Sequence, residues 1–181
     1  MKPLLFFFAI ASTLMACNNN SSNSSATNDT LNVKSTNSKE AKEERNKQIV
    51  KAGTEAFSQH DVEAVAKDFA RDVLDYGDGS RPPVRGVDSF KYNTSQFFKA
   101  FPDMKGENLH YVADGDWVVV WGDWCATWKG VFAGQKATGK SFKVREADVF
   151  KFNNAGRISE HRGIQSGYEI ACQIGMKTPN P

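Results

Sequence analysis

The sequence predicts an α+β fold in which N-terminal helices pack on one face of a curved antiparallel sheet. Up to Pro102, apolar residues recur mainly at the three- and four-residue spacing of amphipathic helices. From Lys105 onward, long alternating or Val- and Trp-rich runs are joined by tight turns, which is typical of antiparallel strands. Helices followed by a run of strands indicate an α+β architecture rather than repeated βαβ units.

The first residues, "MKPLLFFFAIASTLMAC", have the layout of a secretory signal. Lys2 precedes an apolar run, residues 4–10, that is too short to span a bilayer. The ending "LMAC" resembles a bacterial lipobox, and this resemblance implies that a lipid is attached to Cys17 after cleavage in front of it. The alternatives are a plain signal peptide cut nearby and a short N-terminal anchor.

The next segment is almost free of apolar residues, so it cannot bury enough surface to fold. We therefore divide the chain into a lipoprotein signal peptide (1–16), a disordered tether (17–40) and a folded domain (41–181). The expected location is the cell envelope, with the lipid holding the domain on a membrane. Asn18, rather than Asp, follows Cys17, which favours the outer membrane and a domain facing the periplasm.

Three helices are expected before the strands. The first runs from near Lys39 to residue 59 or 60, with apolar residues at helical spacing, and Asp61 can cap a short second helix. A strand over 73–76 and a Gly/Pro-rich turn follow. The third helix begins near Val87, carries Phe residues on one face, and stops at Pro102.

Four strands are expected after the helices, over 107–114, 116–132, 141–152 and 157–166, and "NNAG" forms the hairpin turn before the last one. Side chains alternate along a strand, so His161, Gly163 and Gln165 share one face of the last strand, while Ile158 and Glu160 share the other. A curled sheet capped by helices encloses a cone, whose mouth is a natural site for a small molecule.

Composition excludes some classes of function. The net charge of +2 and the scattered lysines and arginines give no case for nucleic acid binding. With Cys17 lipidated, only Cys125 and Cys172 remain, so a metal site is not expected and no cofactor is predicted. An oxidising periplasm would allow these two cysteines to pair, and the sequence leaves this open.

Several segments together resemble the nuclear transport factor 2-like superfamily, and most of all its SnoaL-like branch, which includes polyketide ester cyclases. They are Phe101-Pro102-Asp103, "ADGDWVVV", "GVFAGQKATGKSF" and "DVFKFNNAGRISEH", and the resemblance covers roughly residues 47–165. It implies a cone of helices on a curved sheet. It also implies acid/base catalysis by a carboxylate, and a His-x-Asp pair on the last strand. Here the pair reads His161-Arg162-Gly163, so the expected acid is missing.

The candidate catalytic residues are His161, Asp148 and Asp75. Asp148 lies on the strand that should pair with the last one, where it could orient the His161 ring and raise its pKa. Glu146 lies on the same face of that strand as Asp148 and is an equal candidate for a carboxylate that faces the cone. Only one of Asp75 and Tyr76 can face inward, the first as a base and the second as a donor to an oxyanion.

The remaining ligand-binding candidates are Trp121, Asp123 and Gln165. Trp117 and Trp121 share one face of their strand, and Trp124 and Trp128 share the other. One pair could line an aromatic pocket, while the commoner arrangement packs one pair under the helices and the other on a dimer face. Asp123 lies on the face of Trp121, where it is either functional or paired with a base such as Arg145.

Two functions are compatible with these residues. The first is a lipid-anchored envelope protein whose cone binds a small apolar or aromatic ligand without turnover, with a homodimer formed through the sheet. The alternative is a cofactor-free acid/base enzyme, such as a cyclase, isomerase, dehydratase or hydrolase, that uses His161 with a nearby carboxylate. The second requires at least two of the candidate groups within hydrogen-bonding reach.

Overall fold

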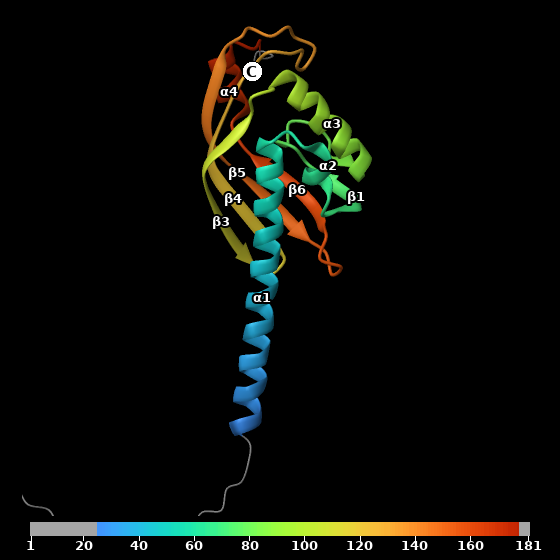
Figure 1. The fold of residues 1–181 in the computed structure, drawn as a ribbon, viewed down its shortest axis with the longest axis vertical. Coiled ribbons are helices and arrows are strands. Elements are labelled where there is room, and N and C mark those ends of the chain that lie inside the picture. Colours follow the sequence, from blue (N-terminus) through green and yellow to red (C-terminus); the bar gives the residue numbers. More distant parts are fainter. Residues whose placement is uncertain (1–24, 178–181) are drawn as a thin grey trace, which may run out of the picture. The chain divides into compact units, whose positions relative to one another are not determined.

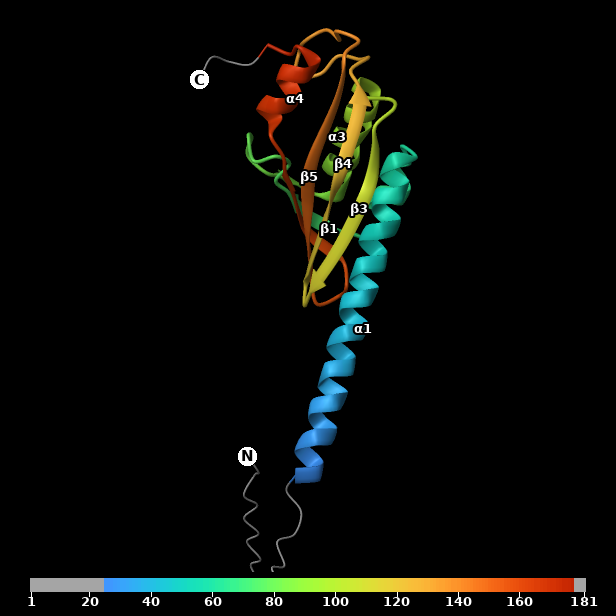
Figure 2. The same cartoon turned by 90° about the vertical axis from the view of Figure 1, so that its left-hand side faces the viewer.

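The structure, a computed structural model, describes residues 25–177, with side chains described from residue 37 onward. The predicted signal peptide 1–16 and the lipidation site Cys17 lie outside the described residues. The chain divides into two units, residues 1–35 and 36–181, and the second contains the sheet and the core. Figures 1 and 2 show this second unit as helices packed around a bent sheet.

The helices before the long strands are α1 (Ser25–Ser58), α2 (Val62–Ala66) and α3 (Val87–Ala100), as the apolar spacing predicts. The Asp61 side chain caps α2 by accepting a hydrogen bond from the Ala64 N–H at 3.0 Å. Because α1 begins at Ser25, residues 25–40 are helical, although the sequence predicted a disordered tether there. A helix that already exists extends through polar residues without a second nucleation cost, so low hydrophobicity did not exclude it.

A fourth helix, α4 (Gly167–Ile174), follows the last strand and was not predicted. The Ser166 side chain accepts a hydrogen bond from the Glu169 N–H at 3.1 Å, and Gly175 ends the helix in the left-handed conformation. Ser166 with Glu169 three residues later, and a glycine after the last turn, are the sequence signals that could have identified it. Ala171 and Ile174 bury its apolar side.

Six strands form one sheet in the order β2-β1-β6-β5-β4-β3. Their bounds are β1 (Phe69–Asp75), β2 (Val84–Arg85), β3 (Lys105–Asp114), β4 (Trp117–Thr127), β5 (Ser141–Phe152) and β6 (Ile158–Ile164). All neighbours are antiparallel except β1 and β6, which run parallel. The sheet is therefore antiparallel, as predicted, except at this one pair, where the chain passes through α3 and four further strands, β2 to β5, before it returns.

The strands bend around the helices, and the concave face of the sheet carries the core (Figure 1). The core has two clusters of buried side chains. The first includes Val73, Phe90, Val120 and Phe150, and the second includes Phe101, Trp124, Trp128, Phe142 and Ile174. This arrangement confirms the α+β class with helices on one face of a curved sheet.

Leu109 reaches the interior through an irregularity in β3, where the pairing with β4 shifts between Glu107 and His110. It lies over two glycines: a Cβ at Gly122 would stand 2.7 Å from Leu109 Cδ2, and one at Gly106 would stand 2.9 Å from Leu109 Cδ1. At Gly122 the carbonyl oxygens of Glu107 and Asn108 also lie 2.8 and 2.9 Å from that Cβ, so a larger residue there would require the backbone to shift.

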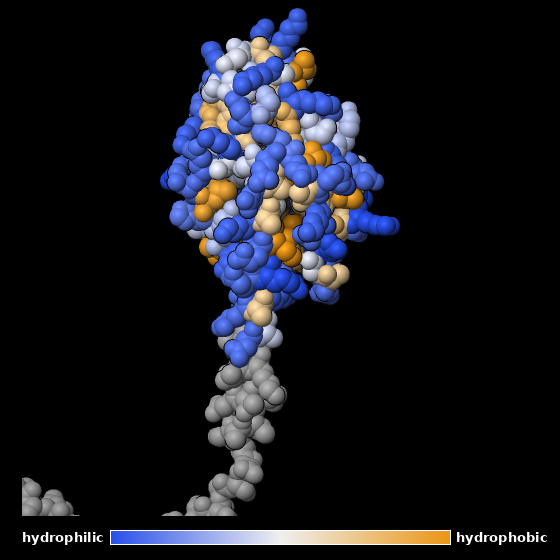
Figure 3. All heavy atoms as spheres, in the orientation of Figure 1, coloured by the Kyte–Doolittle hydropathy of each residue, from blue (hydrophilic) through white to orange (hydrophobic). Residues whose placement is uncertain are grey.

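The surface that carries α1 and α3 is mainly hydrophilic, with hydrophobic side chains in separate small groups (Figure 3). Among the described residues, no helix combines the length and the apolar character that a bilayer crossing requires. Cys125 and Cys172 are both free thiols, so the pairing that the sequence left open is absent here.

Candidate functional site

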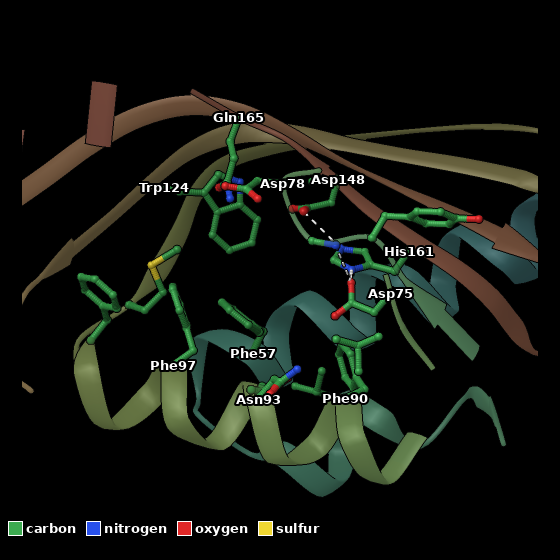
Figure 4. A pocket seen from close by; sticks show the side chains of 18 of the residues that line it. Phe57, Asp75, Asp78, Phe90, Asn93, Phe97, Trp124, Asp148, His161 and Gln165 are labelled. Atoms are coloured by element: carbon green, nitrogen blue, oxygen red, sulfur yellow. Dashed lines mark hydrogen bonds and ion pairs between the residues drawn. The ribbon is translucent and has the colours of Figure 1, made fainter. Parts of the chain in front are cut away.

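A cavity of about 790 Å³ lies between the concave face of the sheet and the helices. Its walls are largely aromatic and include Phe57, Phe90, Phe97, Trp124 and Phe150. Figure 4 shows Phe90, Asn93 and Phe97 of α3 on one side, and Gln165, Asp148 and His161 on the side of the sheet. The cavity, as we call it below, is thus apolar toward the helices and polar along the sheet, an arrangement that suits small-molecule sites.

His161 points into the cavity from β6, the direction that the family resemblance implies. Its side chain exposes 18% of its surface, and its ring packs against Phe150 with a centroid separation of 4.9 Å. Ile158 also borders the cavity, although the sequence placed it on the opposite face. The cause is an extra residue in β6: Ile158 pairs with Phe152 and Glu160 with Lys151, so Ser159 is a bulge that reverses the alternation.

Both ring nitrogens of His161 face a carboxylate. Nδ1 lies 2.8 Å from Asp75 Oδ1, and Nε2 lies 3.3 Å from Asp148 Oδ1 (Figure 4). Asp75 comes from β1, which reaches His161 because it runs parallel to β6 and pairs Asp75 with His161. The hairpin strands β5 and β6 and the strand β1, which is remote from them in sequence, therefore build one hydrogen-bonded line, Asp75–His161–Asp148.

This geometry determines the charge of the histidine. Burial disfavours the charged ring, but the hydrogen bonds and charges of Asp148 and Asp75 outweigh it and raise the pKa of His161 to about 10. Burial also opposes the charge of Asp75, yet His161 and the Gly77 N–H together lower the pKa of Asp75. At neutral pH the His161 ring is thus an imidazolium, which donates one hydrogen bond to Asp75 and one to Asp148.

Asp75, not Tyr76, is the residue of this pair that faces inward. The Gly77 N–H donates to Asp75 Oδ1 at 3.0 Å, which helps to hold the carboxylate beside His161. The Tyr76 ring instead lies under the guanidinium of Arg162, whose Cζ is 4.6 Å from the ring centroid. Tyr76 borders the cavity, but its ring is engaged on the other side of the sheet.

Asp148 stands where the resemblance placed a different acid. It pairs across the hairpin with Gly163, and a Cβ built on Gly163 would lie 3.5 Å from Asp148 Oδ1. The carboxylate on β5 therefore fills the space next to His161 that an acid two residues further along β6 would use. The absence of an acid at Gly163 does not leave His161 without one.

Glu146 also lines the cavity, two residues before Asp148 on the same face of β5. With its amide nitrogen turned toward the carboxyl, Gln165 donates to Glu146 Oε2 at 2.7 Å and to Oε1 at 3.2 Å. Burial, and then the charge of Asp148, raises the pKa of Glu146 to about 8. Glu146 and Gln165 thus form a second polar group in the cavity wall, and Glu146 is mostly protonated at neutral pH.

Trp121 and Asp123, which the sequence offered as ligand-binding residues, lie outside the cavity. Trp121 lies on the outer face of the sheet and stacks on His110 at 5.1 Å between ring centroids. The Asp123 side chain accepts hydrogen bonds from Arg145 and from Asn108, each at 2.9 Å. The pairing of Asp123 with Arg145 is the structural alternative that the sequence left open.

The inward aromatic pair is Trp124 and Trp128, of which Trp124 borders the cavity. Sequence reasoning missed Asn93 as a cavity residue, although it lies three residues after Phe90 and four before Phe97, a spacing that places helical side chains on one side. Among the described residues, no group of three or more His, Cys, Asp or Glu side chains is arranged to hold a metal ion.

Comparisons with known proteins agree with this architecture. A candidate polyketide cyclase from Xanthomonas campestris pv. campestris shares 18% identity at a TM-score of 0.68, over 74% of this chain and 98% of that one. A candidate SnoaL-like polyketide cyclase from Jannaschia sp. shares 18% identity at a TM-score of 0.68, and the match covers 76% of this chain and 95% of that one. The candidate polyketide cyclase IdmH from Streptomyces antibioticus shares 24% identity at a TM-score of 0.58, and the match covers 72% of this chain and 98% of that one. These likenesses show the fold.

No curated protein matches the sequence significantly. Residues 47–174, however, match the family model of the SnoaL-like polyketide cyclases. This match spans most of the described chain and contains every polar residue of the cavity discussed above. The chain therefore belongs to the SnoaL-like polyketide cyclase family.

Proposed function

We propose that the cavity binds a small, largely apolar or aromatic carbonyl compound and that the protein, without a cofactor, removes a proton from the carbon next to the carbonyl group. The observation that carries this proposal is the line Asp75–His161–Asp148, which opens onto an aromatic cavity. A carboxylate near a flat apolar ligand is the arrangement that proton abstraction from carbon requires.

The geometry favours turnover over binding alone. A module that only holds an apolar ligand gains nothing from two carboxylates on one buried histidine, because each buried charge costs desolvation energy. The binding hypothesis drew its support from the missing acid at Gly163, and Asp148 supplies an acid at that place. The similar structures described as polyketide cyclases support the same reaction class.

Asp148 is the proposed base. Its Oδ1 accepts from His161, which leaves Oδ2 to take the proton when the C–H bond breaks and its electron pair moves into the enolate. The His161 ring orients the Asp148 carboxyl group through Nε2, and Asp75 holds the ring from the other side. Asn93, across the cavity on α3, offers an uncharged N–H donor to the enolate oxygen (Figure 4).

Hydrogen–deuterium exchange on 2-tetralone tests this proposal. The ketone is incubated with the protein in D₂O at pD 7.5, and loss of the proton signals next to the carbonyl is followed by NMR against a protein-free control. The wild-type protein should accelerate the exchange, and Asp148→Asn should lower the catalysed rate by about 100-fold or more. Asp123→Asn, on the outer face of the same sheet, should leave the rate unchanged.

Two outcomes separate the two functions. Binding of 2-tetralone, seen as a rise in the unfolding temperature, without any acceleration of exchange would support a binding module and contradict the enzyme. Acceleration that survives Asp148→Asn would remove Asp148 from the role of base.

We also propose that a lipid on Cys17 anchors the protein to a membrane of the cell envelope. The support is the signal-like N-terminus ending in "LMAC". The full-length protein expressed in a bacterium should enter the detergent phase of a Triton X-114 extraction, and Cys17→Ala should move it to the aqueous phase.

A homodimer through the outer face of the sheet is a further part of the proposal. This face exposes Val112, Trp117 and Trp121, of which Val112 is 52% exposed. Sedimentation should give a dimer, and Trp121→Lys should shift it toward the monomer while leaving the cavity intact.

A further inference from the structure

The charges in the cavity wall are out of balance. Three carboxyl groups, Asp75, Glu146 and Asp148, share the sheet side of the cavity with one cationic ring, that of His161. The ring is fully used, because each of its nitrogens is committed to an aspartate. Glu146 therefore has no cation of its own, and a buried carboxyl group is normally paired.

The surroundings of Glu146 offer no substitute within the described part of the chain. Its partner on the adjacent strand β4 is Gly122, which has no side chain. On its other side lies Gln165, a neutral amide that directly follows β6. The other titratable groups in the nearby wall are Asp148 on the same strand, Asp78 in the β1–β2 loop and the occupied His161. Lys67 and Arg81 border the cavity but are exposed, and no ion pair joins either of them to Glu146.

The cavity that Glu146 borders is also lined by the aromatic residues Phe57, Phe97 and Trp124. Phe57 faces the Trp124 ring edge-on at 5.8 Å between centroids. Phe97 follows at 6.1 Å from Phe57. Aromatic faces near a carboxylate attract organic cations more strongly than they attract an anion or a neutral hydroxyl group.

We propose that the ligand carries a protonated amine or quaternary ammonium group, which pairs with Glu146 among Phe57, Phe97 and Trp124. This inference rests on the proposed function, since it names the class of compound that the cavity takes. Glu146 and Asp148 are two residues apart on one face of β5, about 7 Å along the strand. The cation therefore sits about 7 Å from the carbon that loses its proton, which describes an amino-substituted aromatic ketone.

The pairing has a measurable consequence. Glu146 is protonated in the empty cavity at neutral pH, so an ammonium ion that binds there must displace a proton. The affinity for an amine should rise between about pH 5 and pH 8 and level off above that range, provided the amine remains protonated. A neutral ligand of the same shape should show no such rise.

Three probes of one shape test the inference by calorimetry: 2-naphthylmethylamine, 2-naphthalenemethanol and 2-naphthoate. At pH 8 the amine should bind the wild-type protein at least about tenfold more tightly than the alcohol, and the carboxylate should bind most weakly. At pH 7, titrations in phosphate and in HEPES should report close to one proton released for each amine bound.

Glu146→Gln should reduce the amine-to-alcohol ratio to about one and abolish the proton release, while the alcohol still binds. Glu160→Gln is the matched control, because Glu160 lies on β6 next to His161 but pairs with Lys151 at 2.8 Å on the other face. An amine that binds no better than the alcohol, or a preference that survives Glu146→Gln, overturns the inference. Exchange on the neutral 2-tetralone is independent of this result, so the two proposals fail separately. Should Glu146→Gln not fold, proton release by the wild-type protein decides.

Discussion

Replacing Glu146 by glutamine should stabilise the ligand-free protein at neutral and alkaline pH. The substitution keeps the shape of the side chain and removes a carboxyl group that burial and Asp148 make difficult to ionise. In the unfolded chain this group loses its proton near pH 4.5, whereas in the folded protein its pKa is about 8, so it keeps the proton up to about pH 8. Between these values the folded state binds more protons, so its stability falls as the pH rises.

The magnitude follows from the two pKa values. Each pH unit between them corresponds to about 1.4 kcal/mol, so the upper limit is about 5 kcal/mol above pH 8. Water that enters the cavity screens the charge, and we expect about 1 to 3 kcal/mol in practice. Wild type and variant should be equally stable below about pH 4.5, where the carboxyl group is protonated in both states.

Urea unfolding at a series of pH values from 4 to 9 measures this difference, and scanning calorimetry should show a gain of about 3 to 9 °C at pH 8.5. His161 gives a second slope that both proteins share. The stability that the raised pKa of His161 contributes is fully present below about pH 6.5 and is lost as the pH rises through about 10. Equal stability of the two proteins at pH 8.5, or a less stable variant, would show that Glu146 is compensated in the empty cavity and would refute the reasoning.

Two further substitutions test other parts of the structure. Asp75→Asn removes the charge on the Nδ1 side of His161, so the pKa of His161 should fall, as an NMR titration of the ring would show, and unfolding should become easier by about 1 to 3 kcal/mol; an unchanged titration would rule out the contact. Gly122→Ala places a Cβ 2.7 Å from Leu109 Cδ2 and 2.8 Å from the Glu107 carbonyl oxygen, and should cost about 2 to 3 kcal/mol by urea unfolding. Leu109→Ala in the same chain should not restore all of it, because the backbone contact remains, and full restoration would contradict the packing.

The sequence determined the class of the fold because its signals are local. The spacing of Phe90, Thr94 and Phe98 marks the buried side of a helix wherever that helix lies. The alternation of odd and even positions along β4 likewise places Trp117 and Trp121 on one face and Trp124 and Trp128 on the other. In the structure the first pair is exposed and the second pair is buried. Which of the two pairs faces inward is not local, since it depends on the side of the sheet that the helices cover.

The site was only partly predictable for the same reason. His161 and Asp148 lie on adjacent strands of one hairpin, so their proximity follows from a short loop and the alternation. The bulge at Ser159 lies within that hairpin, whereas the parallel pairing of β1 with β6 joins distant segments and brings Asp75 to His161 across 86 positions of sequence. The charge states of His161 and Glu146 depend on burial and on neighbours supplied by other strands, which is why only the tertiary structure decided them.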